Sequence, residues 1–151
     1  MDSIGVVDSM SKNTVIDNQE DQAAFGRFDP YFRCKVMSIY HDDRDEKYCR
    51  AIVMYMLNEY FDLETTRVQV HLTHSYHALQ CYGMCEQGTV DNTYIIHIAR
   101  DQTLRDWVAT LVHEMIHVNQ WETGEWTGDG EKEADRLQYE ITDLLWKEGV
   151  I

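Results

Sequence analysis

The spacing of hydrophobic residues predicts most of the secondary structure. From Asp45 to Phe61, apolar side chains recur every three or four residues, which is typical of an amphipathic helix. The same period predicts a helix from Thr103 to Trp121, with Leu104 on its buried side, and a last helix from about Gly130 to Lys147. Two stretches instead alternate β-branched and polar residues, which predicts strands at Thr65–Thr73 and Asn92–Ala99.

The remaining segments complete the outline of a single domain over residues 28–151. Asp29 followed by Pro30 is typical of a helix start, so we expect a helix from there to Ile39 or Tyr40. The glycines at 83 and 88 predict a strand pair joined by turns between residues 74 and 91. Residues 1–27 are rich in Asp, Asn, Ser and Gln and have no sustained period, so we expect a flexible acidic arm. The order helix, helix, sheet, helix, helix predicts an α+β fold with a small sheet of three or four strands.

The charge balance excludes two classes of partner. The 151 residues include 13 Lys and Arg against 27 Asp and Glu, a formal net charge of −14. Such a chain lacks the clustered basic residues that bind phosphate backbones, so direct nucleic-acid binding is not expected, nor is docking on an anionic membrane. No stretch approaches the roughly 20 apolar residues of a membrane span, and the first residues lack a basic signal region. We therefore expect a cytoplasmic protein whose four cysteines are free thiols.

The sequence HEMIH at positions 113–117 carries the clearest chemistry. His113 and His117 are four residues apart and share one face of the predicted helix, so both imidazoles can reach one Zn²⁺ ion. Glu114 is offset by one residue, beside the open position of such a metal. There its carboxylate can take a proton from a zinc-bound water molecule.

A third ligand is expected at the start of the last helix. Glu131 and Asp135 are four residues apart on one face, so Glu131 can ligate the metal while Asp135 accepts the ring N–H of a ligand histidine. Ala134 is small and would let the two helices approach closely. Glu133 points away from that face and is the reserve ligand. The expected cofactor is one Zn²⁺ ion per chain.

HEMIH followed by EKEAD resembles the HExxH…ExxxD signature of the gluzincin metallopeptidases. The short gap between His117 and Glu131 is similar to that of minimal members of the fold, such as small zincins of phages and bacteria and SprT-like domains. The resemblance covers roughly residues 45–147 and implies a zincin-like core. SprT-like domains use a third histidine, but no histidine follows His117 here, which favours a glutamate ligand.

The resemblance implies the same roles for the site residues and adds a function. By it the zinc ligands are His113, His117 and Glu131, the general base is Glu114, and the orienting acid is Asp135. The implied activity is zinc-dependent hydrolysis of peptide bonds in a protein or peptide substrate. The resemblance also implies an edge strand that binds extended substrate, for which Asn92–Ala99 is the candidate.

Some alternatives stay open at this point. The charge of −14 also suits an acidic protein-interaction or inhibitor module, in which the zinc site is structural or vestigial. A hydroxyl or imidazole that stabilises an oxyanion could come from Tyr139, Tyr76 or His77. We expect plain structural roles for the other histidines and cysteines. His71, His74 and His77 are expected in a surface strand and turn, and His97 on the face of a strand. Cys81 and Cys85 are expected to be buried free thiols.

Overall fold

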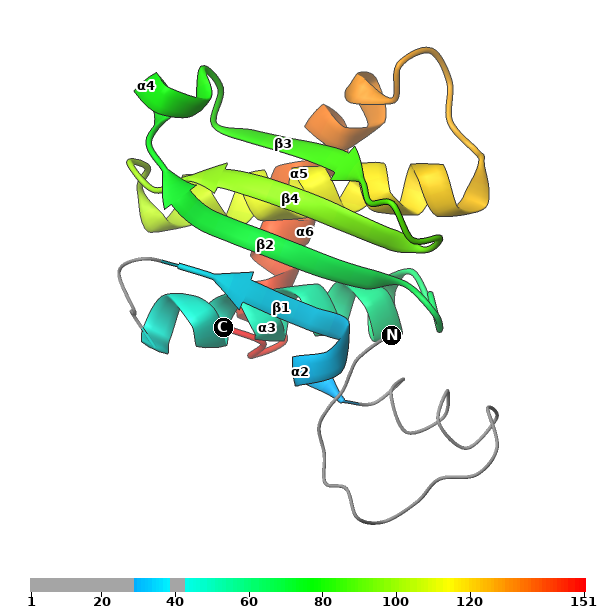
Figure 1. Cartoon of the computed structure of the whole chain (residues 1–151), viewed down its shortest axis with the longest axis horizontal. Coiled ribbons are helices and arrows are strands. Elements are labelled where there is room, and N and C mark those ends of the chain that lie inside the picture. Colours follow the sequence, from blue (N-terminus) through cyan, green and yellow to red (C-terminus); the bar gives the residue numbers. More distant parts are fainter. Residues whose placement is uncertain (1–28, 39–42) are drawn as a thin grey trace.

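The computed structural model describes residues 29–38 and 43–151, which form a four-stranded mixed sheet with helices packed against one face (Figure 1). This architecture confirms the predicted α+β class and the small sheet. The flexible arm predicted for residues 1–27 lies outside the described residues. Along the chain the elements are α2 (Pro30–Arg33), β1 (Cys34–Met37), α3 (Asp43–Tyr55), the π-helical turn η1 (Met56–Tyr60), β2 (Arg67–His74), α4 (Tyr76–Leu79), β3 (Gly83–Gln87), β4 (Thr93–Ala99), α5 (Leu104–Thr123) and α6 (Glu131–Lys147).

The sheet has the strand order β1-β2-β4-β3. Strand β2 pairs in parallel with both β1 and β4, whereas β3 pairs antiparallel with β4 at the sheet edge. Parallel pairing of β1 with β2 needs a crossover, which α3 and η1 provide. Side chains alternate between the two faces, and those of the central strands that point toward the helices are buried: Val68, Val70, Leu72, Tyr94, Ile96 and Ile98.

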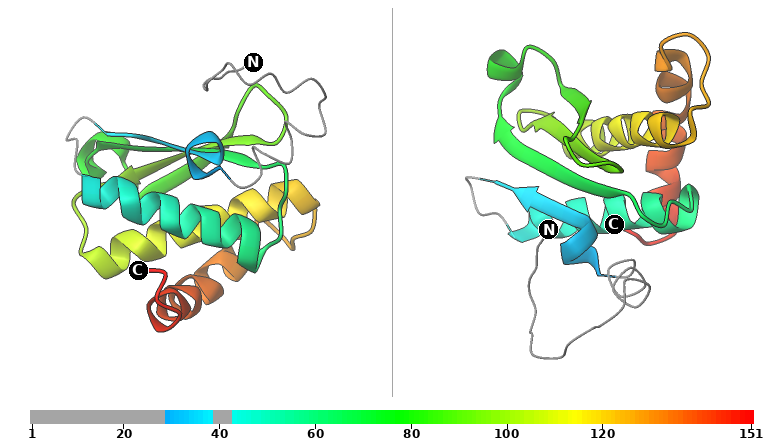
Figure 2. Two further views of the ribbon diagram at one scale, coloured as in Figure 1. Left: turned by 90° about the horizontal axis from the view of Figure 1, so that it is seen from below. Right: turned by 45° about the vertical axis from the view of Figure 1, so that its right-hand side comes forward.

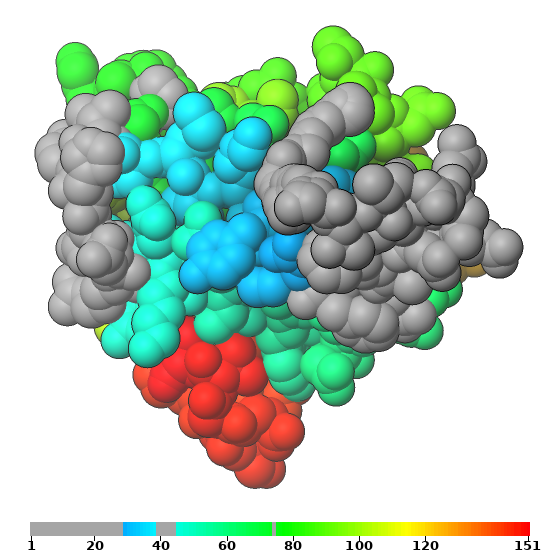
Figure 3. Space-filling view, turned by 60° about the horizontal axis from the view of Figure 1, so that its bottom comes forward, coloured from blue at the N-terminus to red at the C-terminus, as the bar shows by residue number. Residues whose placement is uncertain are grey.

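The core lies between the sheet and two helices. Figure 2 shows α3 and α5 side by side under the sheet, with α6 against α5 on the side away from the sheet. Val150 and Ile151 pack against this core, and the C-terminal end lies next to α3 (Figure 3). Within the described ranges, no helix combines the length and apolar character that crossing a membrane requires.

The helix predicted from Pro30 to Ile39 or Tyr40 is wrong beyond its first turn. Asp29 does cap it, since its carboxylate accepts a hydrogen bond from the Tyr31 backbone N–H at 2.9 Å. The chain then becomes β1, in which Cys34 is fully buried and Lys35 is exposed. Pairing with β2, a segment distant in sequence, overrides the local preference for helix, and residues 39 and 40 lie outside the described part.

Three further predictions need correction. The segment between residues 74 and 91 holds one strand, β3, preceded by the single helical turn α4, and not a strand pair. The candidate edge strand Asn92–Ala99 is β4, which lies inside the sheet between β2 and β3, so the edge strand is β3. Leu104 is 51% exposed because it is the first residue of α5 and precedes the face that meets the sheet.

Candidate metal centre

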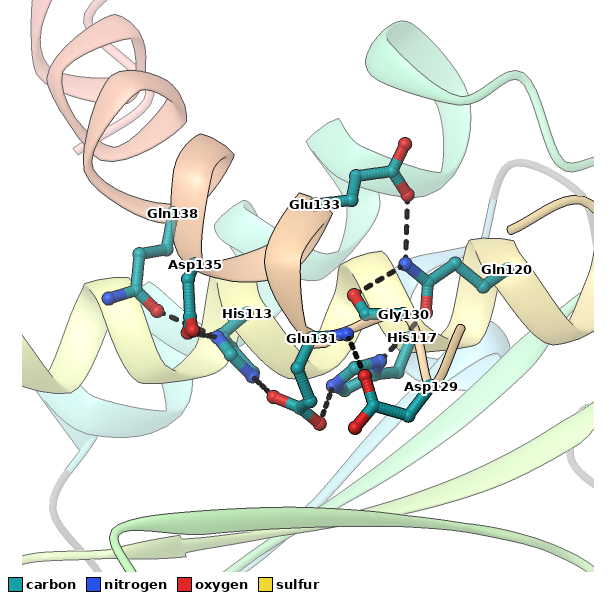
Figure 4. A network of polar contacts seen from close by, with 9 residues as sticks. All are labelled: His113, His117, Gln120, Asp129, Gly130, Glu131, Glu133, Asp135 and Gln138. Atoms are coloured by element: carbon teal, nitrogen blue, oxygen red, sulfur yellow. Dashed lines mark hydrogen bonds and ion pairs between the residues drawn. The ribbon is translucent and has the colours of Figure 1, made fainter. Parts of the chain in front are cut away.

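Helix α5 presents both histidines of the HEMIH motif along one edge. The helix begins after Thr103, whose hydroxyl oxygen accepts a hydrogen bond from the Asp106 backbone N–H at 3.2 Å. Its rotation is fixed because its apolar side chains are buried under the sheet, among them Val108, Leu111, Val112 and Met115. With that face fixed, the His113 and His117 side chains, 14% and 12% exposed, face α6 one turn apart (Figure 4).

Local contacts hold Glu131, the first residue of α6, opposite these histidines. Gly130 precedes it with a φ of +81°, and a side chain on Gly130 would collide with the Gln120 amide, so only glycine fits there. The Asp129 carboxylate accepts a hydrogen bond from the Glu131 backbone N–H at 3.0 Å. Ala134 is fully buried in the core at the start of α6, in agreement with its predicted role in the helix contact.

The three predicted ligands meet at one point. The two Glu131 carboxylate oxygens lie 2.9 Å from His113 Nε2 and 2.9 Å from His117 Nε2. One ligand atom from each residue lies within 4.8 Å of the other two. Donor atoms on a tetrahedral zinc ion are about 3.3 Å apart, given bonds of about 2.0–2.1 Å. His113, His117 and Glu131 could therefore hold one metal ion.

The other ring nitrogen of His113 has a partner that the sequence pattern does not predict. Its Nδ1 lies 2.7 Å from Gln138 Oε1 but 3.5 Å from the predicted acceptor, Asp135 Oδ1. The Gln138 amide is therefore the main contact that orients this ring, and Asp135 adds a longer charge interaction. The periodicity of α6 could have indicated Gln138, because it follows Glu131 by seven residues and shares its face.

Gln120 plays the same part for His117. Its Oε1 lies 2.8 Å from His117 Nδ1, while its amide nitrogen donates to the Gly130 carbonyl at 3.0 Å and to the Glu133 carboxylate at 2.8 Å. These two donated bonds fix which end of the amide faces the histidine. They also hold Glu133 on the far side of α6 from the two imidazoles, so the reserve ligand is not at the centre (Figure 4).

The donor set suits a divalent cation. A histidine that donates its Nδ1–H to an amide oxygen keeps a lone pair on Nε2. Here both Nε2 atoms face the same carboxylate, so the space between them calls for positive charge, which two protons or one metal ion can supply. Two imidazoles and one carboxylate are ligands that zinc accepts, and they leave a coordination position open.

Glu114 lies beside this group and is almost completely buried. Its side chain is 6% exposed, and no residue of the described ranges donates a hydrogen bond to its carboxylate. Burial raises the pKa of Glu114 to about 7, with a smaller upward contribution from Glu131 and an opposing one from His117. The Glu114 carboxylate oxygens are not among the fully enclosed polar atoms without a partner, and the residue lines a cavity. This position suits a group that exchanges a proton with something bound nearby.

A cavity of about 550 Å³ opens next to Glu114 and His113. Of the three side chains considered for an oxyanion, only Tyr139 lines it, and its hydroxyl donates to Asp106 Oδ1 at 2.8 Å. Tyr76 packs against Tyr82 with ring centroids 4.5 Å apart and does not line the cavity, and neither does His77, which is exposed in α4.

The remaining histidines and cysteines form no second metal group within the described residues. His71 and His97 lie on adjacent strands with ring centroids 4.9 Å apart, and His97 Nε2 lies 2.8 Å from the Glu86 carboxylate. His77 lies in α4, and the side chain of His74 is outside the described part. Cys81 and Cys85 are free thiols as predicted, but they are half-buried and not fully buried.

Comparisons with protein-family models, curated proteins and solved structures find no match to this chain. The likeness to gluzincins is therefore limited to the motif residues. The function is inferred from the contacts between those residues and from the surroundings of Glu114.

Proposed function

We propose that this chain is a zinc-dependent metallopeptidase, with one Zn²⁺ ion per chain held by His113, His117 and Glu131. The observation that carries the proposal is the placement of Glu114. Its buried carboxylate receives no hydrogen bond from the described residues, adjoins the three candidate ligands and lines the cavity that a substrate could enter. A structural zinc site needs no such group and usually has four protein ligands, often cysteines.

The choice of zinc follows from the donors. Two imidazole nitrogens and one carboxylate oxygen match the three-ligand sets of catalytic zinc sites, and no thiol belongs to the group. When bound, zinc would supply a Lewis acid that polarises the scissile carbonyl and makes a water molecule more acidic.

The protein side chains would carry the proton movements. The Glu114 carboxylate accepts a proton from the attacking water and later delivers it to the leaving amine. Its burial makes it a stronger base than an exposed glutamate. Gln138 and Gln120 keep the imidazoles in the orientation in which each Nε2 faces the centre.

Strand β3 would hold an extended substrate. It pairs on one side with β4 and, among the described residues, with no strand on the other. Gly83, at its start, packs directly against Thr110 and Glu114 of α5, so a peptide added along β3 would pass the cavity. Main-chain hydrogen bonds to a sheet edge bind peptides with little dependence on sequence.

The variant Glu114→Gln tests the mechanism. It keeps the shape of the side chain but cannot accept the proton, so hydrolysis should fall by about 10²-fold or more while zinc stays near one ion per chain. Metal analysis and mass spectrometry of digests of an unfolded protein substrate measure the two properties. Glu125→Gln, an exposed position after α5, is the matched control and should keep both.

Two results would overturn the proposal. Equal hydrolysis by Glu114→Gln would remove this residue from the mechanism. A protein side chain as fourth ligand in a metal-bound structure would instead favour the acidic interaction module, because a closed coordination shell leaves no place for water.

A further inference from the structure

Gln102 joins three segments of the chain beside Glu114. It lies between β4 and α5, it is half-buried, and it lines the same cavity as Glu114. Its amide nitrogen donates to the carbonyl of Ala99 at 2.9 Å and, over a longer distance of 3.4 Å, to the carbonyl of Tyr82. Its Oε1 atom accepts a hydrogen bond from the Thr110 hydroxyl at 2.9 Å. One side chain thus connects the end of β4, the residue before β3 and the first half of α5.

The Thr110 hydroxyl has one proton and two acceptors within reach. The second acceptor is the carbonyl of Asp106 at 2.8 Å, but this oxygen already accepts the Thr110 backbone N–H inside α5. Gln102 Oε1 has no other donor among the described residues. Because an amide oxygen without a donor is disfavoured in a half-buried place, the hydroxyl donates to Gln102.

This connection is made where the sheet edge meets the candidate base. The Tyr82 carbonyl accepts the Ala99 backbone N–H at 2.8 Å, so it points to β4. Backbone groups alternate along an antiparallel strand, so those of Gly83 point to the edge that no described strand covers. Gly83 also packs directly against Thr110 and Glu114. The residue that would pair with a peptide therefore lies against the base.

Helix α5 is hydrogen-bonded to the sheet region near both of its ends. Toward its C-terminal end, the Glu122 carboxylate accepts hydrogen bonds from the Thr66 and Tyr94 hydroxyls, each at 2.5 Å. Toward its N-terminal end, the Gln102 amide makes the connection through Thr110. Loss of the second connection would release the helix from the sheet edge next to the candidate base, while the other end stays attached.

We propose that Gln102 is a positioning residue that fixes Gly83 of the edge strand against the Glu114 carboxylate. It acts through the Thr110 hydroxyl and the Tyr82 carbonyl. An extended peptide would be held by β3 and the base by α5, so the distance between the scissile bond and the base depends on this connection. A displacement of about 1 Å can lower a rate by about 100-fold. The catalytic consequence rests on the proposed peptidase function, whereas the connection itself can be measured without it.

Thr110→Val and Gln102→Ala test this role, alone and together. Thr110→Val keeps the methyl group next to Gly83 but removes the hydroxyl. Each variant should lower kcat by about tenfold, change KM by less than about twofold and keep its zinc, because β3 and the metal ligands are retained. The double variant should lose no more than Gln102→Ala, since both changes break one connection.

Thr123→Val is the matched control on the same helix. Its hydroxyl also bonds the carbonyl four residues earlier, that of Asn119 at 2.9 Å, but no residue of the sheet. It should keep the wild-type kcat. Unchanged kcat in folded Thr110→Val, additive losses in the double variant, or an equal loss in Thr123→Val would overturn the proposal. Because Thr110→Val preserves the packing, the test does not depend on whether Gln102→Ala folds.

Hydrogen exchange of the zinc-loaded full-length protein separates this claim from the peptidase function. In Gln102→Ala and Thr110→Val, the amides of residues 81–87 should exchange at least about threefold faster than in wild type, while those near Glu122 keep their rates. Unchanged exchange at residues 81–87 would refute the positioning role even if the protein hydrolyses peptides. Faster local exchange in a protein without any hydrolysis would refute the peptidase function alone.

Discussion

Two glutamine side chains decide which nitrogen of each histidine faces the candidate metal centre. Gln138 holds Nδ1 of His113 and Gln120 holds Nδ1 of His117, so that both Nε2 atoms point to Glu131. Partners of this kind set the tautomer and the orientation of a ligand imidazole. The two glutamines differ in one respect, because Gln120 is 3% exposed and ties α5 to Gly130, whereas Gln138 is half-buried.

This difference predicts different outcomes for Gln120→Ala and Gln138→Ala. Each should weaken zinc binding by about 10–100-fold, since each frees one imidazole. Gln120→Ala should also lower the free energy of unfolding by about 1–3 kcal/mol, because it removes hydrogen bonds from a buried site. Chelator competition measures the affinity and chemical denaturation the stability. Equal zinc affinity in wild type and both variants would contradict the role of these amides.

At the residue scale, the sequence predicts the ligand residues better than the hydrogen-bond partners that orient them. The two histidines and Glu131 follow from the four-residue period of each helix and from the motif. The nearest partner of His113 cannot be predicted in this way, because Asp135 and Gln138 both lie on the face of α6 that meets α5. Which of the two reaches the imidazole depends on the length and orientation of the side chain, and residue spacing alone does not give these.

Among the elements, β3 and α5 approach each other so closely that there is no space for a side chain at position 83. A Cβ atom on Gly83 would lie 2.5 Å from Thr110 Cγ2 and 3.2 Å from a Glu114 carboxylate oxygen. Glycine is thus required at the start of β3 because a helix side chain occupies the space, and the edge strand and the proposed base are positioned together.

Gly83→Ala should therefore impair hydrolysis more than folding. The new methyl group has to move β3 or Glu114, so we expect at least a tenfold loss of kcat/KM with zinc content retained and a stability loss of about 1–3 kcal/mol. Gly88→Ala is the matched control, since its Cβ would meet the carbonyl of Thr93 at 3.0 Å, away from the centre. Similar activity losses in both variants would show that the effect is general and does not act through Glu114.

The elements themselves were predictable where their pattern is long. The helices α3, α5 and α6 and the strands β2 and β4 lie where their hydrophobic periods place them. The four residues of β1 were not found, because they are a strand only through pairing with β2, more than 30 positions later. The position of β3 at the edge is likewise a result of strand order, which local patterns do not encode.

For the whole molecule, the buried thiols link stability to pH. Burial raises the pKa of Cys34 to about 12 and also raises that of Cys49. Both side chains are fully buried in the core, on β1 and α3. A thiol that ionises near pH 9 when unfolded and only near pH 12 when folded favours the unfolded state between these values. Its contribution to stability is complete below pH 9 and is lost as the pH rises through this window.

We therefore expect the wild-type free energy of unfolding to fall between pH 9 and 11, by roughly 2–3 kcal/mol on account of Cys34. In Cys34→Ala this part of the decrease should be absent, although the variant is less stable at neutral pH. Cys81→Ala, at a half-buried position, is the comparison and should keep the wild-type slope more closely. Urea denaturation at several pH values measures all three. Parallel curves for wild type and Cys34→Ala would contradict the expectation.

The candidate ligands come from two helices, His113 and His117 from α5 and Glu131 from α6. An ion that needs all three ligands can bind only while α6 is packed against α5, so the bound ion would stabilise the contact between the two helices. Binding to the folded state alone adds about 2.7 kcal/mol of stability at a free-ion concentration 100 times the Kd. Under the proposed function, the metal supply of the cell would then set the lifetime of this protein as well as its activity, because a chain without metal opens more often to proteases.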